Sequence, residues 1–230
     1  MRTWWAVALA SMAWACGSDP AAPGGNVSQP VVPDPPPAQH SLWPLTQGSS
    51  WTYRITDPVT GTFPKDVTVQ GPAQVSDKGA SAIAVVSVQP HIEEHSWQIV
   101  VDGKVLRLRE EDRKNGQPVR DVTWQPSLMM KALSDPKSAG WTETVTLVET
   151  ERNLLTGAVD EKEKVYAWTV EAVNQTVTTP AGTFTNAIKL KRSRPDKTDW
   201  ETRTYWLVPG VGKVREEGER LEELTRYDVK

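Results

Sequence analysis

Residues 97–108 read Trp-Gln-Ile-Val-Val-Asp-Gly-Lys-Val-Leu-Arg-Leu, two runs rich in apolar residues separated by Asp102-Gly103. Asp-Gly is a preferred two-residue loop of a tight β-hairpin. Asn115-Gly116 repeats this signal between residues 107–112 and 119–124. Strands joined by such short turns are antiparallel neighbours. This part of the chain therefore predicts consecutive antiparallel strands.

The same type of signal continues toward the C-terminus. Residues 141–148 alternate apolar side chains with threonines, and residues 165–173 alternate so that Tyr166, Trp168 and Val170 share one face. This period of two is typical of strands with one buried face. Further turns are predicted at 58–61, 156–157, 180–182, 209–212 and 217–218. Together these signals predict about nine to twelve strands, a width at which sheets curl, close or split.

The predicted fold class is therefore all-β, a long antiparallel meander curled into a half-barrel or barrel-like sheet with at most one or two short helices. Residues 126–133 are the one helical candidate, because Leu128, Met129, Met130 and Leu133 could pack together on a sheet. The chain shows no repeat of fixed period, which argues against a propeller.

The N-terminal residues have a different character. Arg2 precedes a short apolar run that ends in small residues beside Cys16, the chain's single cysteine. A run of about a dozen residues is too short to cross a bilayer core, which needs about 20. Residues 1–15 are therefore predicted to be a cleaved signal peptide.

The sequence around this cleavage point, Ala13-Trp14-Ala15-Cys16-Gly17, resembles the end of a bacterial lipoprotein signal sequence. The resemblance implies that several acyl chains are attached to Cys16. With glycine in the next position, it also implies anchoring in the outer membrane, on its periplasmic side or at the cell surface. Ala13-Trp14-Ala15 satisfies the A-x-A rule as well, so ordinary secretory cleavage, which would release a soluble protein, stays open.

The mature chain divides into a tether and a body. Residues 16–41 contain the lipidated cysteine and seven of the 18 prolines, with no Lys or Arg. Such a segment has too few large apolar side chains to fold and is predicted to be a disordered, proline-rich tether. Residues 42–230 are predicted to be a single all-β domain, for which the length is sufficient.

The charge of the mature chain excludes some classes of partner. The whole chain carries 26 basic and 29 acidic residues, a net charge of −3. Removal of Arg2 with the leader makes the mature chain more acidic still. A protein with this balance is not attracted to nucleic acid or to anionic headgroups, so the lipid anchor is the predicted contact with the membrane.

Three stretches of the body carry a resemblance. They are Leu42-Trp-Pro-Leu-Thr-Gln-Gly-Ser-Ser-Trp-Thr-Tyr53, Thr179-Pro-Ala-Gly-Thr-Phe184 and Tyr205-Trp-Leu-Val-Pro-Gly-Val-Gly-Lys-Val214. As a trio, P-L-x3-G-x2-W-x-Y, P-A-G-T-F and P-G-V-G-x-V, they resemble a family of bacterial lipoproteins of unknown function. That family has a distant architectural similarity to the LolA/LolB-like lipoprotein carriers. Each stretch also has a structural interpretation, as a strand start with two aromatic residues, a tight turn and a hairpin.

The sequence offers little catalytic chemistry. His91-Ile-Glu-Glu-His95 matches the H-x-x-E-H pattern of zinc peptidases, but that pattern requires a helix and here strands flank it. The histidines are predicted to lie in a solvated loop. The charged runs 110–112, 160–163 and 216–223 are predicted to be solvated strand faces or hairpins. We expect no enzyme activity, no catalytic residues, no cofactor and no metal site, although an enzyme with residues dispersed over loops stays open.

Tryptophan is unusually abundant, with 11 residues against two phenylalanines. Tryptophans could supply core bulk, or a curled sheet could present them to an apolar cavity. The candidate ligand-binding residues are Trp141, Tyr166, Trp168 and Trp206. The sequence thus predicts a membrane-anchored envelope lipoprotein that binds a lipid or another apolar ligand. The alternative is an envelope interaction or structural protein that binds a protein partner through sheet faces or edges.

Overall fold

The computed structural model describes residues 40–230 except 76–78, 127 and 198–200. The predicted signal peptide, Cys16 and nearly all of the predicted tether lie outside the described residues. The predicted all-β class is confirmed, and no helix occurs in the described part of the chain. The strands are β1 (Ser50–Asp57), β2 (Gly61–Val75), β3 (Ala80–Gln89), β4 (Ile92–Val101), β5 (Lys104–Lys114), β6 (Gln117–Gln125), β7 (Met129–Leu133), β8 (Thr142–Asn153), β9 (Val159–Thr179), β10 (Gly182–Ser193), β11 (Arg203–Val208), β12 (Gly212–Glu217) and β13 (Leu221–Asp228).

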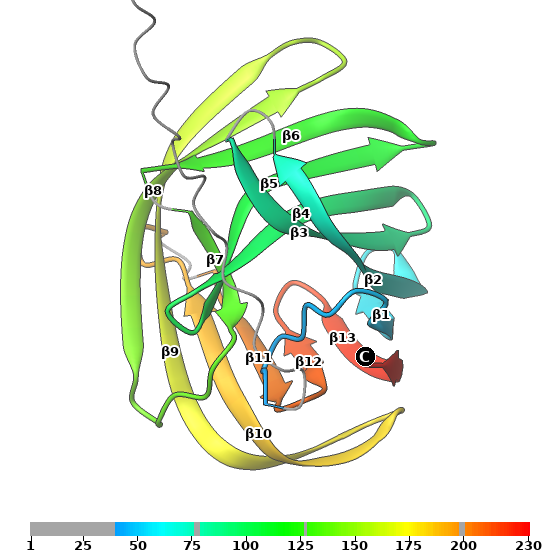
Figure 1. Cartoon of the computed structure of the whole chain (residues 1–230), viewed down its shortest axis with the longest axis vertical. Coiled ribbons are helices and arrows are strands. Elements are labelled where there is room, and N and C mark those ends of the chain that lie inside the picture. Colours follow the sequence, from blue (N-terminus) through cyan, green and yellow to red (C-terminus); the bar gives the residue numbers. More distant parts are fainter. Residues whose placement is uncertain (1–39, 76–78, 127, 198–200) are drawn as a thin grey trace, which may run out of the picture.

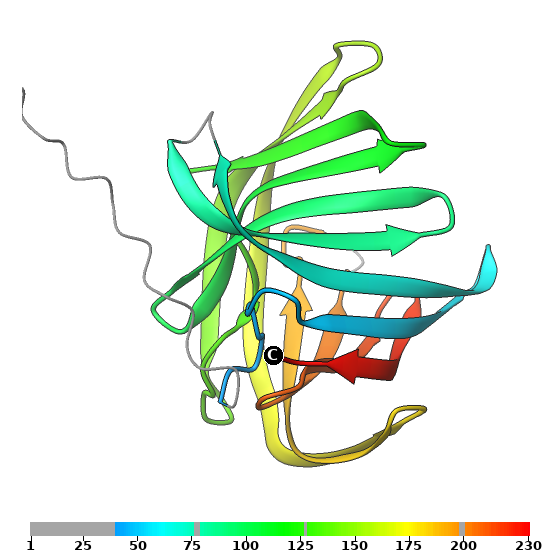
Figure 2. The same ribbon diagram turned by 45° about the vertical axis from the view of Figure 1, so that its right-hand side comes forward.

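Twelve of these strands form a closed antiparallel barrel (Figure 1). Neighbours in the chain are neighbours in the barrel, except that β6 pairs directly with β8. The barrel closes where the first strand meets the last, with Ser50 opposite Asp228. Figure 2 shows β13 lying between β1 and β12 at this closure. A closed sheet of this kind removes the unpaired edges that an open meander would expose.

The predicted hairpins are confirmed by their backbone conformation. Asp102 and Gly103 have φ values of 51° and 72°, and Asn115 and Gly116 have 51° and 75°. Two successive residues with positive φ define the type I′ turn, whose twist matches that of the flanking strands. All the other predicted turns also connect consecutive strands.

The predicted helix at 126–133 is wrong, because its second half is the extra strand β7. Strand β6 pairs with β5 only from Arg109 onward. The first part of β5, Lys104–Arg107, pairs with β7 instead. The backbone N–H and C=O groups on this edge of β5 therefore have hydrogen-bond partners in β7. A helix in the same place would leave these groups without partners. Met129 and Met130 are both buried in this position.

The segment 41–49, just before β1, crosses the barrel; it is drawn in blue in Figure 1. The Leu42 amide donates to the Ser134 carbonyl at 2.8 Å, and the Gly48 amide donates to the Val69 carbonyl at 3.0 Å. Leu42 is fully buried and packs in an apolar cluster with side chains of β6 to β11. Leu45 packs in a second cluster with side chains of β1, β2 and β12. The segment therefore fills part of the barrel's interior with apolar side chains.

The structural interpretation of the three sequence stretches agrees with their contacts. Trp51 donates from Nε1 to the Val211 carbonyl at 2.6 Å, and the Tyr53 hydroxyl donates to the Lys213 carbonyl at 2.9 Å. A side chain at Gly212, where φ is +95°, would lie 3.2 Å from Pro44. The first and third stretches thus pack on each other across the β1–β12 side of the barrel. Their residues fix the fold.

Among the described residues, no helix is long and apolar enough to cross a membrane.

Candidate functional site

The interior of the barrel contains a cavity of about 300 Å³ with a highly charged wall. A barrel of this many strands is wider than inward-facing side chains can fill, so an interior space is expected. Nearly every strand contributes to the wall. The charged residues that line the cavity are Lys65, Glu94, Arg107, Glu110, Arg120, Lys131, Glu149, Lys164, Arg192, Arg194, Glu201, Arg203, Glu216, Arg220 and Glu222.

Glu222 on β13 is the centre of one ion-pair network. It is 1% exposed and accepts hydrogen bonds from Lys213 at 2.6 Å, Arg220 at 2.8 Å and Lys65 at 3.2 Å. Although burial opposes ionisation, these three cations hold the pKa of Glu222 well below its usual range. The carboxylate is therefore charged, and it pairs with cations from β12, β2 and the β12–β13 turn.

Lys213 on β12 is the most enclosed cation of this network. Its ammonium pairs with Glu216 as well as with Glu222 and lies 4.9 Å from the centre of the Tyr53 ring. Burial alone would lower the pKa of Lys213, but the two carboxylates raise it above its usual range. Lys213 is thus a permanent positive charge inside the barrel.

A second network surrounds Arg107 on β5. Arg107 is 7% exposed and pairs with Glu94 at 3.2 Å and with Glu110. Burial opposes the charge of Glu94, but Arg107 and Lys131 outweigh it and lower the pKa of Glu94 to about 2. Arg120 on β6 extends the network, because it bonds to Glu110 at 3.0 Å.

The two networks correct the prediction that the charged runs are solvated. The prediction is confirmed for residues 160–163, which are exposed. It is wrong for Glu110, Glu216 and Glu222, which are 8%, 7% and 1% exposed. Buried charges are costly unless they are paired. Here cations on neighbouring strands supply the pairing, which a local run of sequence does not reveal.

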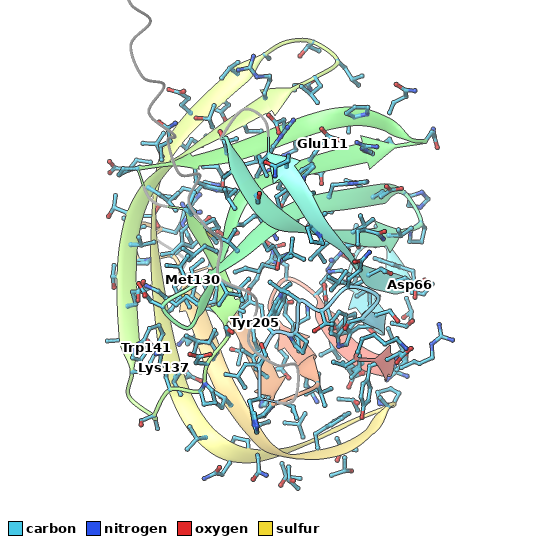
Figure 3. All side chains as sticks on the ribbon, viewed as in Figure 1. Asp66, Glu111, Met130, Lys137, Trp141 and Tyr205 are labelled. Carbon is cyan, nitrogen blue, oxygen red and sulfur yellow. The ribbon has the colours of Figure 1, made fainter. Side chains whose placement is uncertain are left out.

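The four candidate ligand-binding residues do not form one site. Tyr166 lines the charged cavity. Trp168 is 1% exposed and stacks on Tyr205 in an apolar cluster, with 5.9 Å between ring centres. Figure 3 places Tyr205 nearer the middle of the ribbon and Trp141 near its rim. Trp141 is partly buried against the same cluster and does not line the cavity.

Trp206 lies on the outer face of β11. The inward-facing residues on either side of it are Tyr205, which lines the cavity, and Leu207, which is fully buried. Lys189 and Arg215 lie over the Trp206 ring, at 5.7 Å and 5.6 Å from its centre. The ring is partly buried against the second apolar cluster, contacts both cations and does not line the charged cavity.

An apolar cavity is present as well, but it is small. It has a volume of about 50 Å³ and lies between segment 41–49 and strands β1 to β4. Trp43, Leu45, Trp51 and Val85 contribute apolar surface, and the Trp43 Nε1 donates to Gln98 at 3.0 Å. This volume corresponds to a few water molecules. Lys65, Glu94 and Lys131 line this space as well as the charged cavity.

The histidine pair and one group of carboxylates are the residue types that could hold a metal ion. His95 lies on β4, where it pairs with Glu93 beside the Trp97 ring, so the predicted solvated loop is wrong for this residue. Glu94, Glu110 and Asp112 bring carboxylate oxygens within 4.8 Å of one another. Each of these three already pairs with Arg107 or Arg120, so guanidinium groups engage oxygens of all three carboxylates.

Scans against protein-family models, curated proteins and solved structures found no match to this chain.

Proposed function

We propose that this chain is a lipid-anchored protein of a bacterial cell envelope whose barrel binds a small polar ligand in its charged cavity. The observation that carries the proposal is the cavity itself, with about 300 Å³ of space and a wall of charged side chains. That volume lies at the lower end of the range of ligand pockets in proteins. A wall built only for stability would favour apolar side chains, because burying ion pairs brings little net stability.

The polar wall favours a polar ligand over the apolar ligand predicted from the tryptophans. Three of the four aromatic candidates lie in or against the larger apolar cluster, and the fourth, Trp206, lies on the outer face of β11. The binding of a protein partner through strand edges is the second candidate. Besides one side of β7, the pairings leave residues 171–179 on the β8 side of β9 and residues 182–187 on the β11 side of β10 without a strand partner among the described residues.

Native mass spectrometry of the full-length protein extracted from its own membranes tests the proposal. We expect a small polar compound that stays bound without a covalent link and is released on unfolding. Met129 lines the cavity, so Met129→Trp is expected to remove most of the bound compound. The matched control is Val59→Trp on an exposed turn, where occupancy should not change. A bound fatty acid or lipid, or no bound compound and no stabilisation by any small solute, would contradict the proposal.

The anchor is tested separately by the intact mass of the same preparation. We expect a chain that begins at Cys16 and carries the added mass of acyl chains, and a Cys16→Ser variant without that mass. Several acyl chains together hold a protein on a membrane almost permanently, whereas one chain holds it only marginally. An unmodified wild-type chain in the soluble fraction would instead indicate ordinary secretory cleavage.

A further inference from the structure

The cations that line the charged cavity outnumber its carboxylates, nine to six. Seven of the nine pair with at least one carboxylate: Lys65, Arg107, Arg120, Lys164, Arg194, Arg203 and Arg220. For Lys131 on β7 and Arg192 on β10, no ion pair is formed within the described part of the chain. The cavity therefore contains two basic side chains that have no carboxylate partner within ion-pair distance among the described residues.

Aromatic rings hold both of these cations in place. The Lys131 ammonium lies 6.0 Å from the centre of the Trp43 ring. The Arg192 guanidinium lies 5.3 Å from the Tyr166 ring centre and 5.8 Å from that of Trp168. A cation–π contact orients a positive group but leaves its hydrogen-bond donors available. The two side chains are thus positioned and still able to bind an acceptor.

Three arginines of the same wall carry a buried donor without an acceptor. The Nε–H groups of Arg107, Arg192 and Arg203 have no hydrogen-bond partner among the described residues. Arg107 itself is 7% exposed. A buried donor without an acceptor is unfavourable, and all three belong to side chains that line this one cavity.

The arginines of this wall lie close to one another, although they carry the same charge. Arg192 lies directly opposite Arg203 in the pairing of β10 with β11. Burial lowers the pKa of Arg107, and the positive charge of Arg192 contributes to that lowering. Like charges opposite each other on paired strands destabilise a sheet. An anion between them would turn this repulsion into attraction.

We propose that Lys131 and Arg192, with Arg107 and Arg203 beside them in the wall, form an oxyanion site in the cavity, which binds the phosphate or carboxylate group of a small ligand. This inference rests on the proposed function and assigns the chemical class of its ligand. Arginine and lysine are the residues that proteins use for both groups. The Tyr205 hydroxyl lines the same cavity and can add a further donor.

The probes are inorganic phosphate and succinate, added separately to the detergent-solubilised full-length protein at neutral pH and constant ionic strength. We expect either or both to bind saturably in calorimetry and to raise the unfolding temperature. Phosphate alone would assign the site to phosphate groups, and succinate alone would assign it to carboxylates. If neither binds, the inference is overturned.

Two variants locate the site. Arg192→Gln and Lys131→Met each remove a cation that has no carboxylate partner, so both should fold, and each should weaken binding by about tenfold to a hundredfold. Without an anion, neither variant should be less stable than wild type. Arg215→Gln is the matched control, because Arg215 also lies over a tryptophan ring but on the outer face. Binding that is unchanged in Arg192→Gln and Lys131→Met, or equally weakened in the control, overturns the inference.

Lys131 provides a second readout that a purely structural role would not change. Burial and the charge of Arg107 hold the pKa of Lys131 well below its usual range. An anion beside the ammonium would raise that pKa, so succinate binding should take up a proton and tighten as the pH falls. The other charged groups that act on Lys131 are Glu94, Lys65 and Lys213. Calorimetry in buffers of different ionisation enthalpy measures the uptake, which should disappear in Lys131→Met.

The outcomes of these experiments also show whether the oxyanion site alone fails or the proposed function fails with it. A neutral polar compound bound in the cavity, with occupancy unchanged by Arg192→Gln, would overturn the oxyanion site and keep the cavity as a binding site. An empty cavity that no solute stabilises would overturn both.

Discussion

Glu222→Gln is expected to lower the free energy of unfolding by about 3–5 kcal/mol, as for other buried ion pairs that lose one partner. The wild-type carboxylate faces Lys213, Lys65 and Arg220 and is itself 1% exposed. The amide keeps the shape of the side chain but removes the charge that compensates these cations. Urea unfolding at neutral pH measures the difference.

The neighbouring residue supplies a matched control for this variant. Glu223 points to the other face of β13 and pairs with Arg54, whose side chain is 48% exposed. Exposed ion pairs of this kind contribute at most about 1 kcal/mol. Glu223→Gln should therefore cost no more than that. Equal losses in the two variants would mean that the charges of the interior are solvated like those of the surface.

The same carboxylates set the stability in acid. Burial opposes the charge of Glu222 and Glu94, but neighbouring cations lower both pKa values, that of Glu94 to about 2. A group whose pKa is lower in the folded state stabilises the protein above its unfolded pKa. That contribution is lost as the pH falls through the folded pKa. Wild type should therefore lose stability from about pH 4.5 downward, and Glu222→Gln should lose less over this range.

The local part of the fold could be predicted from the sequence, because it depends on residues next to each other. Asp102-Gly103 and Asn115-Gly116 adopt positive φ readily, and that conformation alone fixes the direction of the next strand. Closure of the ring depends on the pairing of residues 50–57 with 221–228, which no local signal specifies. The sequence could therefore predict a curled meander but could not choose between a half-barrel and a closed barrel.

The charged cavity could not be predicted from the sequence, because the alternation of apolar and polar residues does not distinguish a packed core from a cavity. Residues 165–173 alternate clearly, so the inward direction of Tyr166 and Trp168 could be predicted. Whether an inward residue meets apolar side chains or open space depends on strands that are distant in sequence. Tyr205-Trp-Leu-Val208 contains no polar residue to set the phase, so the outward direction of Trp206 could not be predicted.

A signal for the cavity is present, but it is weak. Strand β12 carries charge on both faces, with Glu216 directed inward and Arg215 outward. A strand of a small barrel or sandwich would have one apolar face. The neighbouring strand β13 shows the same pattern, with Glu222 directed inward and Glu223 outward. Charge on both faces of adjacent strands therefore indicates a wide barrel with a polar interior. The prediction of solvated hairpins assumed that these charged side chains are exposed to solvent on both faces of the strands.

Leu42→Ala is expected to lower the free energy of unfolding by about 2–5 kcal/mol, the range found for buried leucines. Leu42 is fully buried in the larger apolar cluster, and its amide holds the segment 41–49 to the Ser134 carbonyl. The matched control is Leu155→Ala in the β8–β9 turn, where the side chain is 73% exposed and the change should stay within about 0.5 kcal/mol. Chemical denaturation of both variants measures the difference.

This comparison also tests how the barrel is attached to its predicted tether. The predicted tether directly precedes the segment that contains Leu42, so the packing of this segment would fix the start of the barrel relative to it. Trp43 in the same segment contacts Lys131, one of the two unpaired cations. A segment that is firmly packed therefore holds a wall of the cavity in place. Equal stability of the two alanine variants would mean that the segment is not part of the folded barrel, and Lys131 would then lose the ring that positions it.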